Sequence, residues 1–357
     1  MKARVILTRT VEKNFTIDRY HSRAFDLYFG NASVCALDIE TTDLSPDRSR
    51  FVLGGLLVQE ETSATLKQFF AEDPAEERLL LSLYLEEAAK VDALITYNGA
   101  RFDLPFLRAR AERHGLPAPD FPYHFDLYSA LNRFSSLRKI LPNLKQKTVE
   151  NFMGLWHLRE DEISGGDSAR LYQEYLRAAA NGADTERAVE TMLLHNRDDV
   201  LQLARLLPAL EKADLHGAMR AFGFSVPAAG GRTALVVEKI EIGADFLSVS
   251  GRQRADAVDF IAYGDFDDDV FVKFDKADGR FFLKFRIIRE SGLALLDLAK
   301  RSAPLREKMA AYPNRGDDYL VLENRRRVNH AEVNAFVIHW LQELDIFTLC
   351  PPGGTRD

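Results

Sequence analysis

Two carboxylates separated by a single residue are the first feature of this sequence whose spacing could support chemistry. Asp38 and Glu40 end an apolar run within residues 34–42, VCALDIETT. Because neighbouring side chains of a β-strand point to opposite faces, both carboxylates lie on one face of a strand there, and Ile39 points to the other. Carboxylates this close repel each other and lose hydration at a core edge, unless a cation lies between them. Mg²⁺ and Mn²⁺ suit such an all-oxygen site.

A strand that simply runs out into solvent is the alternative explanation of this pair. In that case Asp38 and Glu40 begin a turn at Thr41, Thr42 and Asp43. For an isolated pair of carboxylates this explanation is favoured. A metal site therefore requires further oxygen ligands from other parts of the chain.

A second group of polar residues falls where a strand is expected to pass into a helix. Residues 98–106, NGARFDLPF, follow an expected strand at 93–97 and enter an expected helix at 102–114. Ligands of mixed α/β sheets gather at such strand ends, and Gly99 permits the tight turn. Asp103 either contributes to a site there or caps the helix, and the motif taken alone favours the cap.

A histidine and an aspartate form the third group. His195 and Asp199 lie on the long helix expected from about residue 184 to 207, where residues four apart share a face. They are either an ion pair without a catalytic role, or a proton-handling group beside a metal ligand. Asp198 is an alternative to Asp199, because it too lies within one turn of His195.

The elements that must position these groups alternate between strands and helices. Strands are expected at residues 4–8, 34–42, 51–59, 64–70, 93–97 and 123–126, and helices at 74–90, 102–114 and 184–207. Short polar turns make the strands from 34 to 70 three antiparallel neighbours. The pattern predicts an α/β fold with a mixed sheet, three antiparallel strands followed by parallel ones, flanked by helices on both faces.

Composition places the chain among globular proteins with two domains. Its 357 residues are 46% hydrophobic and 28% charged. A net charge of −7 argues against a protein that coats nucleic acid, so a polyanion must bind through a local basic surface and a metal site. Two cysteines, and no apolar run long enough for a signal peptide or membrane span, predict a cytoplasmic protein without membrane contact.

Taken in order, the three groups resemble the exonuclease motifs of the DEDD superfamily, which has a ribonuclease-H-like fold. The motifs are D-x-E (Asp38, Glu40), N-x-x-x-F-D (ending at Asp103) and H-x-x-x-D (His195, Asp199). The intervening stretches HFDL, LKQKTVE and HNRDDVL narrow the resemblance to the YprB-type ribonuclease-H-like exonuclease family. The resemblance covers about residues 33–210.

This resemblance implies a site for two divalent cations, Mg²⁺ or Mn²⁺. Asp38, Glu40 and Asp199 would bind one ion, and Asp38 with Asp103 the second, so that the pair clamps the attacking water and the leaving oxygen of a phosphodiester. His195 takes the position of the group that activates that water. The histidine branch of the superfamily usually places its histidine five residues before the aspartate, whereas this chain has four, as in the tyrosine branch.

Nucleic-acid contacts are expected next to these motifs. By position, Asn98, Arg101 and Phe102 are candidates at the second motif. Between residues 132 and 147 the sequence has basic residues and no acid, and the candidates there are Arg138, Lys139, Lys145 and Lys147. They either neutralise phosphates along a groove or form an ordinary solvated helix face.

The C-terminal part changes character and carries no recognisable motif. A boundary is expected near residue 212, with residues 1–32 as an extension packed on the first domain and 213–357 as a smaller accessory α+β domain. Strands are expected at 235–242, 246–249, 258–262, 270–275, 280–288 and 319–323, and helices at 293–310 and 330–344.

The sequence thus predicts a metal-dependent 3′→5′ exonuclease acting on single-stranded DNA or RNA, with DNA repair or nucleic-acid processing as its setting. A helicase or repair protein is a candidate partner. A non-catalytic module that binds nucleic acid or protein is the alternative, and a phosphodiesterase for small molecules is a third. The four acidic residues of the motifs favour the enzyme, because a degenerate site usually loses its metal ligands.

Overall fold

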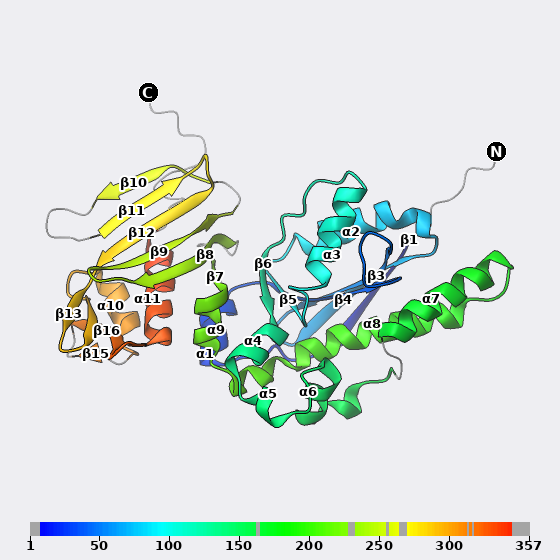
Figure 1. Cartoon of the computed structure of the whole chain (residues 1–357), viewed down its shortest axis with the longest axis horizontal. Coiled ribbons are helices and arrows are strands. Elements are labelled where there is room, and N and C mark those ends of the chain that lie inside the picture. Colours follow the sequence, from blue (N-terminus) through cyan, green and yellow to red (C-terminus); the bar gives the residue numbers. More distant parts are fainter. Residues whose placement is uncertain are drawn as a thin grey trace. The chain divides into compact units, whose positions relative to one another are not determined.

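The computed structural model describes residues 8–161, 165–227, 233–254, 257–263, 270–312, 314–315 and 318–344. Its backbone contacts divide the chain into two compact units (Figure 1). The first comprises Met1–His21 and Ser33–Asp214, and the second comprises Ser22–Ala32 and Leu215–Asp357.

The first unit is built on a six-stranded mixed sheet. Its strands are β1 (Thr8–Thr16), β2 (Val34–Thr41), β3 (Phe51–Gln59), β4 (Ser63–Ala71), β5 (Ala93–Thr96) and β6 (Tyr123–Asp126), in the order β1-β4-β3-β2-β5-β6. Strands β1 to β4 pair antiparallel, and β2, β5 and β6 pair parallel. The predicted mixed sheet is therefore confirmed, with β1 as an additional antiparallel edge strand.

The opening strand lies further along the chain than the sequence predicted. A short strand was expected at 4–8, whereas β1 runs from Thr8 to Thr16 and pairs with β4 along its whole length. Residues 1–7 lie outside the described part of the chain. The polar sequence TRTVEKNFT hides this strand, because only one of its faces packs on protein.

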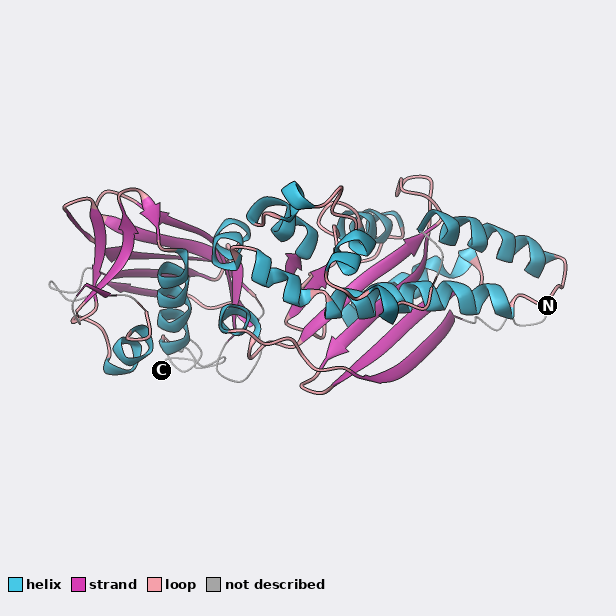
Figure 2. Ribbon diagram, turned by 90° about the horizontal axis from the view of Figure 1, so that it is seen from below, coloured by secondary structure: helices cyan, strands magenta, loops and turns pink. Residues whose placement is uncertain are grey.

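Helices cover both faces of this sheet. They are α2 (Glu77–Ala88), α3 (Asp103–Arg113), α4 (Leu127–Phe134), α5 (Leu137–Ile140), α6 (Gln146–Phe152), α7 (Gly165–Ala180) and α8 (Glu186–Arg205), with short 3₁₀ helices at Pro74–Glu76, Trp156–Leu158 and Leu207–Lys212. Residues of α2 and α3 pack with Leu37 and Ile39 in one core cluster. Residues of α7 and α8 form a second cluster with Val52 and Phe70. Figure 2 shows helices packed over the strands of this sheet.

The second unit is an α+β fold with two antiparallel sheets. The larger has the order β10-β11-β12-β9-β8-β7, and its strands are β7 (Phe224–Pro227), β8 (Thr233–Ile242), β9 (Phe246–Gln253), β10 (Phe260–Tyr263), β11 (Val270–Asp275) and β12 (Arg280–Arg286). The smaller contains β13 (Ile288–Glu290), β14 (Leu293–Asp297), β15 (Asn314–Arg315), β16 (Tyr319–Asn324) and β17 (Arg327–Val328). Its helices are α1 (Arg23–Phe29), α9 (Leu215–Phe222), α10 (Ala303–Met309) and α11 (His330–Glu343).

Helix α1 belongs to this second unit, although residues 1–32 were expected to pack on the first domain. Its buried side chains are Phe25, Tyr28 and Phe29, and the helix contacts α9 and β7 of the C-terminal half. The Tyr28 hydroxyl lies 2.7 Å from His216 Nδ1, and its ring lies 5.5 Å from that of Phe224. Sequence periodicity cannot assign a helix this short to a partner that lies 188 residues away.

The helix expected at residues 293–310 is a strand followed by a shorter helix. Strand β14 pairs with β16, and α10 begins only after Ser302, whose hydroxyl accepts a hydrogen bond from the backbone N–H of Leu305. A short leucine-rich run fits a buried strand and a buried helix equally well. Among the described residues, no helix is both long enough and apolar enough to cross a bilayer.

Candidate metal centre

Strand β2 places Asp38 and Glu40 on the face of the sheet that α8 covers. Ile39 packs on the opposite face with α2 and α3, as the alternation of the strand predicts. Glu40 is buried, and its carboxylate Oε1 lies 3.5 Å from Nε2 of His195 on α8. The two acids therefore lie under a helix rather than at an exposed turn.

Asn196 holds Asp38 against α8. Its Nδ2 donates a hydrogen bond of 3.0 Å to the carboxylate Oδ2 of Asp38, and its own Oδ1 accepts a 3.0 Å bond from Gln68. Position 55, opposite Asp38 on β3, needs a glycine, because a Cβ there would lie 2.3 Å from Asn196 Oδ1. The sequence interpretation did not identify Asn196 or Gly55. The only indication in the sequence that Asn196 belongs to the site was its position between His195 and Asp199 on the same helix.

Asp103 lies at the first position of α3 and is buried. Burial raises the pKa of its carboxyl, and the backbone N–H groups of Ile39 and of Asp103 itself lower that pKa in part. The charge of Asp103 in turn helps to raise the pKa of Asp38. Asp126 on β6 fixes the preceding turn by accepting hydrogen bonds from the backbone N–H groups of Asn98 and Ala100. Asp103 therefore belongs to the carboxylate cluster. The expectation that it caps the helix is wrong, because Phe102 occupies the N-cap position and Asp103 is the first helical residue.

Helix α8 brings His195 and Asp199 to the same cluster. The Nε2 atom of His195 lies 3.5 Å from Asp199 Oδ2, as well as from Glu40 Oε1. One ligand atom from each of Glu40, His195 and Asp199 lies within 4.8 Å of the others, which is a suitable arrangement for a metal ion. The predicted one-turn spacing on α8 thus places both side chains toward β2.

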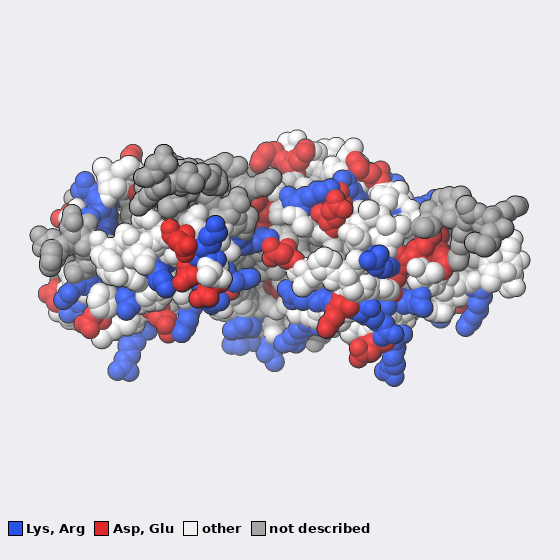
Figure 3. All heavy atoms as spheres, turned by 90° about the horizontal axis from the view of Figure 1, so that it is seen from above, with Lys and Arg blue, Asp and Glu red and all other residues white. Residues whose placement is uncertain are grey.

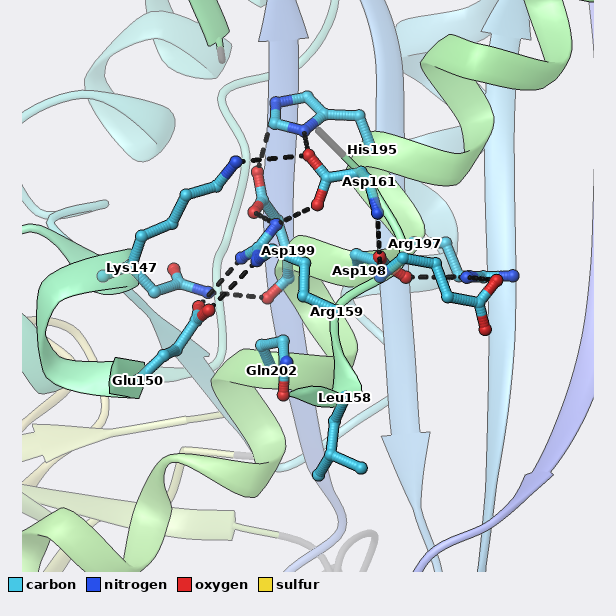
Figure 4. Close-up of polar contacts among 12 residues, drawn as sticks. Lys147, Glu150, Leu158, Arg159, Asp161, His195, Arg197, Asp198, Asp199 and Gln202 are labelled. Atoms are coloured by element: carbon cyan, nitrogen blue, oxygen red, sulfur yellow. Dashed lines mark hydrogen bonds and ion pairs between the residues drawn. The ribbon is translucent and has the colours of Figure 1, made fainter. Parts of the chain in front are cut away.

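Asp161 is the main contributor that the sequence did not reveal. Its side chain is only 2% exposed, and its Oδ2 lies 2.6 Å from Nδ1 of His195 (Figure 4). A hydrogen bond from Nδ1–H to this carboxylate leaves Nε2 directed at Glu40 and Asp199. Asp161 follows an irregular stretch 34 residues before His195, so no local spacing indicates the pair.

Arg159 connects this pair to Asp199. Its side chain is 7% exposed, and its NH1 lies 2.6 Å from Asp161 Oδ1 and 2.7 Å from Asp199 Oδ1. The remaining donors Nε and NH2 bind Glu150 at 3.0 and 2.8 Å (Figure 4). The guanidinium of Arg159 thus pairs with one carboxylate oxygen of Asp199, and the other oxygen faces His195.

Asp198 has a separate structural role, which settles the choice between it and Asp199. Its Oδ2 accepts hydrogen bonds from the backbone N–H groups of Glu160 and Asp161, at 2.6 and 2.8 Å. Its Oδ1 pairs with Arg197 (Figure 4). Asp198 therefore anchors the segment that carries Asp161, and only Asp199 belongs to the cluster with Glu40.

The cluster is electrostatically strained without a cation. Burial and the charges of Asp199 and Asp103 hold the pKa of Asp38 well above its usual range. Burial also raises the pKa of Glu40 to about 8 and that of Asp103 to about 7, and the pKa of Asp199 is raised as well. Buried oxygen donors that repel one another fit a hard divalent cation, which offsets both costs.

The pKa shifts of the His195–Asp161 pair favour the charged forms, unlike those of the carboxylate cluster. Burial lowers the pKa of His195, but the hydrogen bond to Asp161 and the charges of Asp199 and Glu40 outweigh it, so the net shift is upward. Burial raises the pKa of the Asp161 carboxyl, and its bonds to His195 and Arg159 reverse this and hold it below the usual range. Asp161 therefore stays ionised at neutral pH.

The seven residues predicted to contact nucleic acid differ in their exposure to solvent and in their packing. Arg101, Arg138, Lys139 and Lys145 are exposed, and Asn98 occupies the turn after β5 with a φ of 69°. The ring of Phe102 packs 5.6 Å from that of Phe106 at the core edge. Lys147 lies 3.3 Å from Asp161, so its ammonium belongs to the charge network beside the cluster.

Comparison with known proteins points to one superfamily. Residues 35–211 match the sequence family described as RNase_H superfamily. The chain is 30% identical over 181 residues to the protein YprB of Bacillus subtilis. The aligned region covers 49% of this chain and 41% of YprB. The chain thus spans less than half the length of this relative.

Similar solved structures include a family B DNA polymerase of Pyrobaculum calidifontis, at 16% identity and a TM-score of 0.38, covering 90% of this chain and 44% of that one. Another is Brucella melitensis NrnC, at 20% identity and a TM-score of 0.32, covering 54% of this chain and 78% of that one. The sequence match over residues 35–211 and the mixed sheet together show a ribonuclease-H-like domain in the first unit, which is similar in sequence to part of YprB.

Proposed function

We propose that this protein is a metal-dependent 3′→5′ exonuclease that hydrolyses phosphodiester bonds of single-stranded DNA or RNA. The observation that carries the proposal is the convergence of Asp38, Glu40, Asp103 and Asp199 from β2, α3 and α8. The raised pKa values of these four buried carboxyls support a site for cations, because a cation offsets the repulsion between them. The ribonuclease-H-superfamily match supports a nuclease in general.

Two divalent cations, Mg²⁺ or Mn²⁺, are proposed for this site. Asp38, Glu40 and Asp199 would hold one, and Asp38 with Asp103 the other. Bound there, the ions would supply a nucleophilic water at neutral pH and stabilise the charge that develops on the phosphate. The arrangement of Arg159 on one oxygen of Asp199 leaves its second oxygen for this purpose.

His195 is proposed as the general base. Asp161 holds Nδ1, so the lone pair of Nε2 faces the region between Glu40 and Asp199. A base aimed in this way can accept a proton from water bound beside the scissile phosphate. The four-residue spacing from His195 to Asp199 suits this direction, because both side chains leave α8 on the same face.

Substrate contacts are proposed at the exposed basic residues of the same unit. Arg101 follows β5 in the turn that precedes Asp103. Arg138 and Lys139 lie on the short helix α5, and Lys145 is the N-cap residue of α6. Figure 3 shows acidic and basic side chains interspersed over the face that it presents. Phosphate binding would therefore be local, as the net charge of −7 requires. A helicase or repair protein that delivers the strand is part of the same proposal.

The test is degradation of single strands labelled at the 5′ end or at the 3′ end, in DNA and in RNA, with Mg²⁺, Mn²⁺ or EDTA. A 3′→5′ exonuclease yields a ladder of shortening products from the 5′ label and mononucleotide from the 3′ label, and EDTA abolishes both. Mononucleotide esters are tested in parallel. Hydrolysis of these esters without any cleavage of polymers would overturn the proposal in favour of a small-molecule phosphodiesterase.

A further inference from the structure

In the part of the chain that the structure describes, the larger sheet of the second unit has one face covered by a helix and one open face. Helix α11 packs on the covered face (Figures 1 and 2). There the ring of Phe285 lies 5.1 Å from that of Phe336 and 4.9 Å from that of Trp340. Alternate residues of β12 and β11, such as Phe282 and Lys273, point to the other face. On edge strand β10, side chains of the open face are 55% and 76% exposed, at Ile261 and Tyr263.

Aromatic rings form a row across three neighbouring strands of this open face, β10, β11 and β12. Register pairs place Tyr263 opposite Phe271 and Phe271 opposite Lys284, so these side chains share one face. The rings of Tyr263 and Phe271 lie 5.2 Å apart, and those of Phe271 and Phe282 6.2 Å apart. With strands spaced about 4.8 Å apart, a row from β10 to β9 spans about 14 Å.

Basic side chains lie between and beside these rings. The ammonium of Lys284 lies 5.4 Å from the ring of Phe282 and 5.6 Å from that of Phe246, across β12 and β9. Lys273 lies opposite Phe282 and also contacts Asp275 at 3.0 Å. Arg252 and Arg280 flank the row and share Glu238. Exposed ion pairs of this kind contribute little to stability, so a phosphate of a bound strand can replace the carboxylate as the partner of the basic side chain.

We propose that this open face, defined by Tyr263, Phe271, Phe282, Lys284 and Phe246, binds single-stranded nucleic acid. Bases stack on exposed aromatic rings regardless of sequence, and nearby lysines and arginines neutralise the phosphates that link them. A protein partner fits less well, because the centres of protein interfaces are depleted of lysine, and here Lys284 lies between two rings. The proposal is separate from the carboxylate cluster, since binding needs no cation.

The test measures binding of a fluorescently labelled oligothymidine or oligouridine to the full chain by anisotropy, in EDTA so that no strand is cut. We expect Tyr263→Ala and Phe271→Ala each to weaken binding about tenfold, since base stacking on aromatic rings contributes on this scale. Lys284→Glu should weaken binding about fivefold, and it should reduce the number of counterions released on binding, read from the salt dependence of the affinity, by about one. Lys308→Glu, an exposed lysine on α10, is the matched charge control and should change neither.

Photocrosslinking of a 5-bromouridine strand then locates the contact. Crosslinks on β10 and β11 are expected in the wild-type protein and also in the Asp38→Asn variant, so the result does not depend on catalysis. Unchanged affinity in Tyr263→Ala and Lys284→Glu, with crosslinks confined to residues 33–214, would overturn the proposal. Specific competition by a protein ligand, with no oligonucleotide binding to this face, would do so as well.

Discussion

The carboxylate cluster makes the free energy of unfolding of the metal-free protein depend on pH at individual residues. Asp38, Glu40 and Asp103 have raised pKa values, so the folded protein binds protons there more tightly than the unfolded chain does. Stability contributed by such groups is present at acid pH and is lost as the pH rises through the raised pKa values, which reach about 8 at Glu40. Divalent cations should restore it by replacing those protons.

The first prediction is that Asp38→Asn stabilises the metal-free protein. At pH 8 in EDTA, removing one buried charge should raise the free energy of unfolding by about 1–2 kcal/mol, and the Tm by about 2–8 °C. The gain should shrink at pH 5.5, where Glu40 and Asp103 are already protonated in the wild type. Mn²⁺ should raise the Tm of the wild type but hardly that of the variant, in scanning calorimetry.

Asp47→Asn serves as the control, because Asp47 is an exposed acid of the same unit. It should leave both the metal-free Tm and the Mn²⁺-induced rise unchanged. A less stable Asp38→Asn variant in EDTA that retained the full response to Mn²⁺ would show that Asp38 is not a cation ligand.

The second prediction concerns Asp161, which contacts His195 and no expected substrate atom. Asp161→Asn removes the charge that keeps the proton on Nδ1, so turnover should fall about tenfold to a hundredfold, as for other groups that orient a catalytic side chain. The KM for the strand and the affinity for Mn²⁺ should stay unchanged. Nitrogen-15 NMR should show Nδ1-protonated His195 in the wild type and a changed ring state in the variant.

Asp167→Asn, a half-exposed ion-pair partner of Arg170, is the matched control and should retain full turnover. If Asp161→Asn raised KM alone and left the imidazole nitrogen shifts unchanged, Asp161 would have only a structural role in its loop.

At the scale of elements, a buried ion pair fixes α2 and α3 beside the cluster. The guanidinium of Arg110 on α3 donates from Nε and NH2 to the carboxylate of Glu77 on α2, at 2.6 and 2.5 Å. The same carboxylate accepts the backbone N–H of Phe51, the first residue of β3. One carboxylate thus joins two helices and a strand on the face opposite α8.

The third prediction is that Glu77→Gln lowers the free energy of unfolding by about 3–5 kcal/mol at pH 7, because it leaves Arg110 buried and unpaired. Burial raises the pKa of Glu77, but its hydrogen bonds to Arg110 and Phe51 outweigh this, and the net pKa is lowered. Its contribution is therefore present at neutral pH and lost as the pH falls below about 4.

Urea unfolding of the variant and the wild type at pH 7 and at pH 3.5 checks this prediction, and the difference should shrink at the lower pH. Glu86→Gln, an exposed acid on α2, is the control and should change little at either pH. An equal loss at both pH values would show that shape rather than charge holds these elements together.

Strands and helices with a clear hydrophobic period could be predicted, and so could the residues that they carry. Asp38 and Glu40 share a face because β2 alternates, and His195 and Asp199 share one because α8 is a regular helix. Asp161 follows an irregular segment after the 3₁₀ helix Trp156–Leu158. Its partners come from folding in three dimensions, so neither period nor spacing reveals them.

At the scale of the whole molecule, the chain passes between its two units three times. Residues 1–21 belong to the first unit, Ser22–Ala32 to the second, Ser33–Asp214 to the first again and the rest to the second. Folding of the second unit therefore requires α1 and the C-terminal half of the chain together. No hydrophobic period predicts this exchange, because the α1 sequence RAFDLYF is compatible with either core.

The fourth prediction is that Tyr28→Ala destabilises the second unit selectively. Tyr28 is fully buried, and its hydroxyl accepts a 2.8 Å hydrogen bond from Asn334 on α11. Loss of such a ring should cost about 3–5 kcal/mol. Hydrogen exchange should accelerate across residues 215–344, while β2 to β4 of the first unit keep their protection. Tyr263→Ala, at an exposed tyrosine, is the control. Faster exchange in β2 to β4 instead would assign α1 to the first unit.

The central claim is that the carboxylates of β2, α3 and α8 hold the cations that cut a phosphodiester. The most direct measurement is single-turnover cleavage of a 5′-labelled single strand with Mn²⁺ by the wild type, by Asp38→Asn and by Asp47→Asn. We predict a cleavage rate for the wild type and Asp47→Asn that EDTA abolishes, and a loss of at least about a thousandfold in Asp38→Asn, since that change removes a shared ligand. Equal rates in Asp38→Asn and the wild type would contradict the account.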